Sequence, residues 1–173
     1  IAFKSNIDKE GNPNLSPFSF FNVVSSNPPI LLFSPARKGE NGGLKDTYYN
    51  LKEVPEVVIN VVHYQMVEQM SLSSVSYAKG VNEFEKAGLT PIPSELVKPF
   101  RVKESPVQFE CEVQQIIELG EEAGAGNLIL CLVKRIHVQT SILDAKGQID
   151  PFLIDLVGRM GGPYYVRTVK EAL

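Results

Sequence analysis

The sequence Val107-Gln108-Phe109-Glu110-Cys111-Glu112-Val113-Gln114 alternates strictly between apolar and polar residues, and no other stretch of the chain does so as cleanly. Successive side chains of a β-strand point to opposite faces of the sheet. This period of two therefore predicts a strand with one face in the core and the other in water. The pattern changes phase at Ile116-Ile117, which indicates a β-bulge. We therefore expect a fold organised around β-sheet.

Segments on either side of this stretch predict further strands. The apolar run at 128–133, within 126–138, is typical of a strand covered on both faces, and the β-branched run at 57–62 of a central strand. Shorter strands are expected at 1–6 and 30–33. Short helices are expected at 46–53, beginning with Asp46 or Thr47 as the cap, and at 64–72, 82–87 and 150–157. Strands outnumber helices, which predicts a mainly-β class, a barrel or sandwich with peripheral helices.

Composition excludes several classes of protein. The 173 residues are 43% hydrophobic and 21% charged, which is ordinary for a folded globular chain and excludes disorder or a coiled coil. This length predicts a single domain spanning 1–173. The 17 basic and 20 acidic residues leave a net charge of −3, without the basic excess of a nucleic-acid binder. Apolar runs such as 128–133 are far shorter than the ~20 residues of a membrane span.

The cysteines and histidines do not suggest a metal site. Cys111 and Cys131 lack the spacing of metal ligands and lie in apolar or alternating stretches, so we expect buried thiols in a reducing compartment. His63 and His137 stand apart from other ligand types. No signal peptide opens the chain, and we expect a cytoplasmic protein.

A set of cations and a hydroxyl surrounds one predicted helix start. Arg37 and Lys38 precede a glycine-containing loop, and Lys45-Asp46-Thr47 follows it. The start of a helix offers unpaired N–H groups and a partial positive charge, a Thr hydroxyl can donate to a phosphate oxygen, and Lys and Arg add full charges. This chemistry suits a phosphate. A solvated loop with an ordinary cap explains the same residues, and their chemistry alone leaves both interpretations open.

Two other segments combine aromatic residues with glycine, proline or small polar residues. In 14–22, small polar residues alternate with aromatic ones beside Pro17, so backbone groups there could bind the edge of a heteroaromatic ring. In 160–167, Gly161 and Gly162 allow close backbone approach and two tyrosines could cover an apolar ligand. The alternatives are a β-edge with core phenylalanines for the first segment and a plain turn for the second.

Several motifs occur in an order that resembles a known family. The chain resembles the flavin reductase-like family of FMN-binding split β-barrels, in the branch often described as flavoprotein oxygenase-associated. The motifs that carry this resemblance are Asn14-Leu15-Ser16-Pro17-Phe18-Ser19-Phe20-Phe21-Asn22, Ser26-Asn27-Pro28-Pro29, Phe33-Ser34-Pro35-Ala36-Arg37, Lys45-Asp46-Thr47 with Asn50, Val58-Ile59-Asn60, Phe84-Glu85, Ala87-Gly88-Leu89-Thr90, Ser105-Pro106-Val107 and Gly158-Arg159-Met160-Gly161-Gly162.

The resemblance implies a split barrel that binds FMN at the interface of a homodimer. It implies three groups of flavin-binding residues. Backbone groups of Ser16, Pro17, Phe18, Ser19 and Asn22 would line the flavin, and Ser34, Pro35, Ala36 and Arg37 would continue that wall. Lys45, Asp46 and Thr47 match the motif on the phosphate side, with Asn50 nearby. The resemblance therefore favours the phosphate interpretation of the helix start.

One departure from the family bears on function. Many active reductases of this family carry Gly-Asp-His at the start of a late strand, where the His helps to hold the nicotinamide nucleotide. The corresponding stretch here is Gly124-Ala125-Gly126-Asn127-Leu128, with Asn127 near the position of the His. This departure leaves FMN binding intact and calls NAD(P)H oxidation into question.

Three functions follow in order of preference. The first is an FMN-binding oxidoreductase of the flavin reductase type, passing electrons from NAD(P)H through flavin to an acceptor or an oxygenase component. The second is an FMN-binding carrier or electron-transfer protein without NAD(P)H turnover. The third is a flavin-free dimeric barrel used for protein interaction. Because flavin carries the redox chemistry, no side chain is assigned as a catalytic acid or base.

Overall fold

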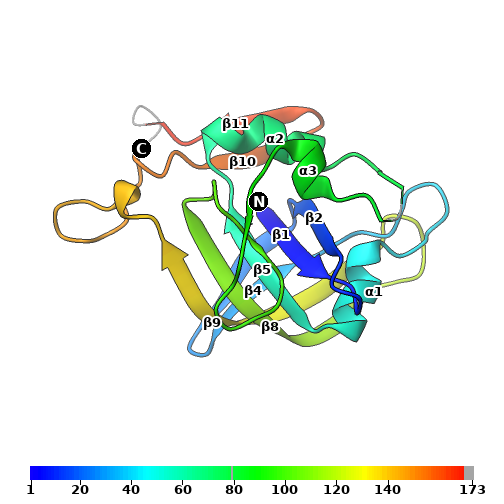
Figure 1. Ribbon diagram of the computed structural model, residues 1–173. Helices are drawn as coiled ribbons and strands as arrows, with labels where there is room; N and C mark the ends of the chain where they lie inside the picture. Colours follow the sequence, from blue (N-terminus) through cyan, green and yellow to red (C-terminus); the bar gives the residue numbers. More distant parts are fainter. Residues whose placement is uncertain (79, 170–173) are drawn as a thin grey trace.

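The computed structural model describes residues 1–78 and 80–169, which build a seven-stranded antiparallel sheet (Figure 1). Across the sheet the strand order is β2-β1-β5-β8-β9-β4-β3. The mainly-β class predicted from the sequence is confirmed. The strands are β1 (Ala2–Ile7), β2 (Pro13–Phe18), β3 (Phe21–Ser26), β4 (Pro29–Phe33), β5 (Glu56–Val61), β8 (Val107–Glu118) and β9 (Asn127–Val138).

The sheet must curl into a barrel, since its two edge strands, β2 and β3, are close in sequence. Only Ser19 and Phe20 separate β2 from β3, and two residues are too short to cross the width of a flat seven-stranded sheet. The Phe18 and Phe33 rings stack with 5.7 Å between their centroids, across the point where the edges meet. The inner face is lined by one apolar cluster: Ala2, Phe18, Leu31, Phe33, Leu51, Val57, Ile59, Cys111, Ile129 and Cys131.

Short helices cover the outer face of β1 and β2. Phe3 and Leu15 pack there in a second apolar cluster with Met70 of α2 and Phe84 of α3. Within the described residues, no helix is long and apolar enough to cross a membrane. The remaining elements are α1 (Asp46–Glu53), η1 (Tyr64–Met66), α2 (Val67–Leu72), α3 (Glu83–Ala87), β6 (Pro91–Ile92), β7 (Arg101–Val102), η2 (Thr140–Ile142), β10 (Val157–Gly161) and β11 (Tyr164–Arg167).

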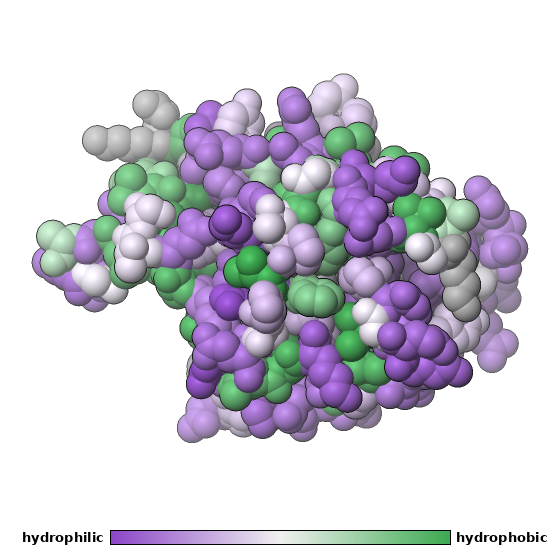
Figure 2. All heavy atoms as spheres, in the orientation of Figure 1, coloured by the Kyte–Doolittle hydropathy of each residue, from purple (hydrophilic) through white to green (hydrophobic). Residues whose placement is uncertain are grey.

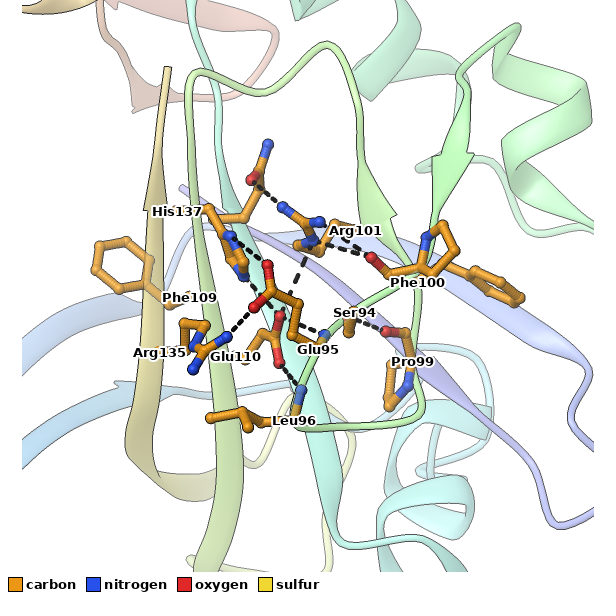
Figure 3. A network of polar contacts seen from close by, with 12 residues as sticks. Ser94, Glu95, Leu96, Pro99, Phe100, Arg101, Phe109, Glu110, Arg135 and His137 are labelled. Carbon is orange, nitrogen blue, oxygen red and sulfur yellow. Dashed lines mark hydrogen bonds and ion pairs between the residues drawn. The ribbon is translucent and has the colours of Figure 1, made fainter. Parts of the chain in front are cut away.

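The predicted period of β8 is confirmed, but its predicted wet face is wrong at Gln108 and Glu110, whereas Glu112 is half-exposed and Gln114 is exposed. Gln108 is only 4% exposed and Glu110 is fully buried, because the chain from β6 to β7 crosses over them. Figure 3 shows the Glu110 carboxylate facing the backbone of this crossing segment, with His137 and Arg101 beside it. The register of β8 against β9 shifts twice, between Glu110 and Cys111 and between Val113 and Gln115, the second slightly before the expected position of the bulge. Alternating polar residues therefore show which side chains share one face of a strand, but they do not show whether that face is exposed to water.

Two other expectations need correction. In β9, Ile129 and Cys131 are buried, but the alternate residues Leu128, Leu130 and Leu132 on the opposite face are only half-buried, so the strand is not covered on both faces. No helix forms at 150–157. The Asp150 carboxylate accepts from the N–H groups of the second and third residues after it, as at a helix start, but the chain then turns and enters β10.

Candidate functional site

A cleft of about 700 Å³ opens between β2, the loop before α1 and the segment after α2. The elements around it, β2, α1 and α3, lie in the right half of Figure 1, and Figure 2 shows mainly hydrophilic side chains on that side. Its volume lies within the range of ~300–1,000 Å³ found for small-molecule sites. Its lining consists of Asn14, Ser16, Pro17, Phe18, Lys38, Gly39, Glu40, Asn41, Lys45, Asp46, Thr47, Ser73, Ser74, Val75, Ser76, Tyr77 and Glu83.

Two predicted groups of site residues meet in this cleft although about 30 positions separate them in the chain. Ser16, Pro17 and Phe18 come from β2, and Lys45, Asp46 and Thr47 come from the start of α1. The Lys45 ammonium lies 5.5 Å from the centroid of the Phe18 ring, which joins the two groups. The cleft therefore places an aromatic face next to a cation and a hydroxyl.

The electrostatics of the α1 end favour an anion. Burial, and then the positive charge of Lys38, lower the pKa of Lys45 below its ordinary value. A cation that is partly desolvated and close to another cation is stabilised by a negatively charged ligand. Thr47 is almost fully buried, and its hydroxyl donates to Asn14 Oδ1 at 3.3 Å. The predicted helix is confirmed, with Lys45 rather than Asp46 or Thr47 in the N-cap position and no side-chain cap.

Arg37 lies outside the cleft lining and holds its neighbouring loop. Its guanidinium donates to Gly120 O at 2.9 Å, to Gly42 O at 3.1 Å and to Glu118 Oε2 at 2.9 Å. These contacts connect the loop that follows Arg37 to the turn between β8 and β9. Arg37 therefore braces a wall of the cleft, and its direct contact with a phosphate stays a prediction.

The segment 34–36 runs beside the start of β9. Ser34 and Pro35 are buried, and Ala36 bridges to Gly126. A Cβ atom on Gly126 would lie 2.8 Å from Ser34 Oγ, so the two segments approach more closely than a larger residue allows. The role of these residues in a flavin wall stays a prediction, because they do not line the cleft as it stands.

Asn127, which the resemblance leads us to expect near the position of the family's His, supports this same segment. Its side-chain amide donates to Pro35 O at 2.9 Å, and its backbone N–H donates to the same oxygen at 3.2 Å. Asn127 is 2% exposed, and its Oδ1 atom has no hydrogen-bond partner among the described residues. A side chain used in this way holds backbone in place and is not free to act as the His would.

The remaining predicted residues lie at the margins of the cleft. Ser19 is exposed in the turn between β2 and β3, and Asn22 is exposed on β3, where its Oδ1 accepts from Val23 N–H at 2.9 Å. Asn50, on α1, lines a smaller hollow that shares Asp46 and Glu83 with the main cleft. Flavin contacts of these three residues stay predictions.

Glu83 in the lining of the cleft, and Lys4 directly behind it, were missed by the sequence reasoning. Lys4 is fully buried, and its ammonium donates to Asn6 Oδ1 at 2.7 Å and to Asn14 Oδ1. Glu83 accepts from Asn14 Nδ2 at 2.8 Å. A signal for Lys4 was available: it shares its strand face with Ala2 and Asn6, which puts it inside the barrel once that strand is central.

The hydroxyl-rich segment 73–77 was also missed. Ser73, Ser74, Ser76 and Tyr77 line the cleft from the chain after α2. Nothing in its sequence points to this position, because only the packing of α2 against the outer face of the barrel brings it there. Among residues 1–78 and 80–169, no three His, Cys, Asp or Glu side chains gather as a metal site requires.

Comparison with protein families identifies one that matches most of this chain. The family model of the flavin reductase-like domain matches residues 4–156. A relative from Aquifex aeolicus is 38% identical over 171 residues, which cover 99% of this chain and 85% of that protein.

Solved structures show the same fold. Component B of nitrilotriacetate monooxygenase from Bacillus cereus is 33% identical, with a TM-score of 0.90 over 98% of this chain and 83% of that chain. The 2-nitrobenzoate 2-nitroreductase NbaA of Pseudomonas fluorescens is 26% identical, with a TM-score of 0.84 over 96% of this chain and 79% of that chain. The barrel described above is therefore similar to these structures over almost its whole length.

Proposed function

Because the chain belongs to the flavin reductase-like family, we propose that it binds FMN in the cleft between β2 and α1 and works as a flavin-dependent oxidoreductase. One observation carries the proposal: the two family motifs around Ser16 and Lys45 converge on one cleft of about 700 Å³. We further propose that 1–173 form a single domain.

The residues of the cleft fit FMN. Lys45 and the Thr47 hydroxyl would hold the phosphate, and Asn50 would lie close to it. Phe18 and the backbone of Ser16 and Pro17 would lie along the ring system, with the segment around Arg37 as the neighbouring wall. When bound, FMN would supply the redox chemistry of the proposed oxidoreductase, and the protein's residues would bind and orient it.

We propose an oxygenase component as the electron acceptor. The support is the similarity to component B of nitrilotriacetate monooxygenase from Bacillus cereus, whose name places it in a monooxygenase system. The buried, free thiols Cys111 and Cys131 support a reducing compartment such as the cytoplasm.

We also propose a homodimer, with the outer face of β4 and β9 as the contact. Leu32 pairs with Leu130 and Ile30 with Leu132, so their side chains share one face, and all four are only half-buried. An apolar face of this kind needs a cover, and a two-fold homodimer is the commonest one. Light scattering after size exclusion should give twice the chain mass, and Leu130→Lys should shift it to the single mass. A monomeric wild type would reject the dimer.

The experiment for FMN is an absorbance spectrum of the purified protein with and without added FMN, before and after desalting. Flavin bands that survive desalting, or a perturbed spectrum of added FMN, would support the proposal. Colourless protein that does not alter added FMN would favour the flavin-free barrel instead.

A second function, an FMN carrier without NAD(P)H turnover, is favoured by Asn127. This side chain stands near the place of the family's His and is used to hold Pro35 O. Anaerobic addition of NADH or NADPH to the FMN-loaded protein separates the two functions. Rapid bleaching of the flavin favours the reductase, whereas bleaching by dithionite alone favours the carrier.

A further inference from the structure

Lys4 is a cation inside the barrel without an acidic partner in contact. On β1 it pairs with Ser16 of β2 and Ile59 of β5, and Ile59 belongs to the inner apolar cluster. Residues that face each other across antiparallel strands share a face, so Lys4 points inward. It is fully buried, and no carboxylate of residues 1–78 and 80–169 lies within 4.0 Å of its ammonium. Buried charges are normally paired, so this position needs an explanation.

The ammonium is connected to the cleft through one side chain. Asn14 lines the cleft, and its Oδ1 accepts hydrogen bonds from Lys4 and from the Thr47 hydroxyl. The Lys4 ammonium also lies 6.0 Å from the centroid of Phe18, another lining residue. Lys4 therefore lies immediately behind the wall that Thr47 and Phe18 present to a ligand.

The charges around Lys4 compensate it only in part. Burial lowers its pKa to about 7; Glu83 from α3 and Asp46 from α1 oppose this shift, and Lys45 adds to it. The two carboxylates line the cleft and attract the ammonium from a distance. An anion in the cleft would supply the missing negative charge.

We propose that Lys4 is a specificity-determining residue that makes this cleft prefer a phosphorylated flavin to the same flavin without its phosphate, acting from inside the barrel and through Asn14. The inference rests on the proposed function, because it assumes that the cleft binds flavin. Lys4 does not touch the ligand. Its positive charge lies behind the wall of the cleft. Its ammonium donates to Asn14 Oδ1, so this oxygen keeps a hydrogen-bond donor when the Thr47 hydroxyl turns to donate to the phosphate.

The arrangement couples binding to a proton. When a phosphate dianion enters, it stabilises the ammonium form of Lys4, so above neutral pH FMN binding should take up a proton. Riboflavin has the same ring system and no phosphate, and it should bind without this uptake. Glu83, Asp46 and Lys45 are the other charged groups that act on Lys4, and they are present for both ligands.

The experiment compares FMN with riboflavin on the flavin-free protein. Dissociation constants of both are measured for the wild type, for Lys4→Met and for Lys9→Met, which removes the same charge from an exposed turn. We expect Lys4→Met to weaken FMN at least about tenfold and riboflavin by less than about threefold, since it removes a buried positive charge behind the phosphate position and the hydrogen bond to Asn14 Oδ1. Lys9→Met should change neither.

A second measurement is available if Lys4→Met does not fold. Titration calorimetry at about pH 8, in buffers of different ionisation enthalpy, should show proton uptake with FMN and none with riboflavin. The pKa of Lys45 is also lowered, so the uptake should persist in Lys45→Met, and its loss there would assign the proton to Lys45 and overturn the inference. Equal loss of both flavins in Lys4→Met, or equal proton uptake for both, would overturn the inference and leave the proposed function standing. If the wild type binds neither flavin, the proposed function fails and the inference fails with it.

Discussion

The carboxylate of Glu110 on β8 lies 2.6 Å from Nε2 of His137 on β9, with the carboxylate fully buried. The same carboxylate accepts from the N–H groups of Glu95 at 2.9 Å and Leu96 at 2.6 Å, and Arg101 Nε lies 3.9 Å away (Figure 3). One acidic side chain therefore fastens the crossing segment between β6 and β7 to two barrel strands.

Glu110→Gln should destabilise the protein strongly. The substitution replaces one acceptor oxygen with an NH₂ group that faces N–H donors, and it removes the charge that strengthens these hydrogen bonds. We expect the free energy of unfolding, measured with urea, to fall by about 2–4 kcal/mol. Glu112→Gln is the matched control, because Glu112 lies on the same strand and pairs with Lys134 in a half-exposed position, so its loss should cost less than about 1 kcal/mol. Equal effects of both substitutions would contradict the fastening role.

Removal of Lys45 or of the Thr47 hydroxyl should weaken FMN binding. Lys45→Ala and Thr47→Ala each remove one contact proposed for the phosphate, at a cost of about 1.5–3 kcal/mol for a charge-assisted bond. Fluorescence titration of the flavin-free variants gives the dissociation constants. Lys52→Ala, in the last turn of α1, is the control. Unchanged affinity in both variants would place the phosphate elsewhere.

Arg37→Met should lower the stability of the flavin-free protein. The guanidinium holds Gly42 O and Gly120 O as well as Glu118, so its loss releases the loop before α1 from the turn after β8. Urea unfolding of Arg37→Met, Glu118→Gln and the double variant would give the coupling between the two side chains. Because Glu118 is 43% exposed, we expect a coupling of at most about 1 kcal/mol and a larger total loss for Arg37→Met. An unaffected flavin-free protein would favour direct phosphate contact as the only role of Arg37.

The two thiols should be inert in the folded protein. Burial, and then the negative charge of Glu110, raise the pKa of Cys111 to about 12, and burial followed by the neighbouring Cys111 raises the pKa of Cys131 well above its ordinary value. A coloured disulfide reagent at about pH 8 should label neither thiol in the native state and both in urea, because only the thiolate reacts. Rapid labelling of the native protein would contradict the buried positions.

Stability should rise with pH just above neutrality because of Lys4. Its folded pKa of about 7 lies below the ordinary value of 10.5, so between these values the unfolded chain binds more protons than the folded one. The destabilising contribution of the buried ammonium is therefore greatest below pH 7 and fades as pH rises.

We expect the free energy of unfolding of the flavin-free wild type to increase from about pH 7 to about pH 8.5. The cysteines act in the opposite direction as the pH nears their unfolded pKa of about 8.5, and the Ile1 amino group, whose pKa is also lowered by burial, acts in the same direction as Lys4. The difference between the wild type and Lys4→Met therefore isolates Lys4. Lys4→Met should lack the increase and Lys9→Met should retain it. A wild type whose stability is flat over this window would place the Lys4 pKa elsewhere.

Local sequence determined the elements and the family. The alternation along β8, the β-branched run in β5, and Asn82 and Gly88 at the ends of α3 are short-range signals, because strand period and helix capping depend on neighbours a few residues apart. The motifs around Ser16 and Lys45 identified the family for the same reason. Residues 150–157 show the limit of such signals, since an Asp-Pro start does not form a helix when the following residues enter a hairpin.

Tertiary structure alone decided what covers each face and which groups meet. Glu110 has the pattern of a solvated residue and is buried because a segment distant in sequence crosses it. Lys4 lies behind the cleft because β1 pairs with β2 on one side and β5 on the other, which turns its side chain into the barrel. The burial of a residue and the charges around it depend on all the neighbours that the fold brings together, whereas strand alternation and helix capping depend on residues a few positions apart. For this reason the sequence by itself determined the barrel and its phosphate motif, and only the packed chain placed a buried cation behind that motif.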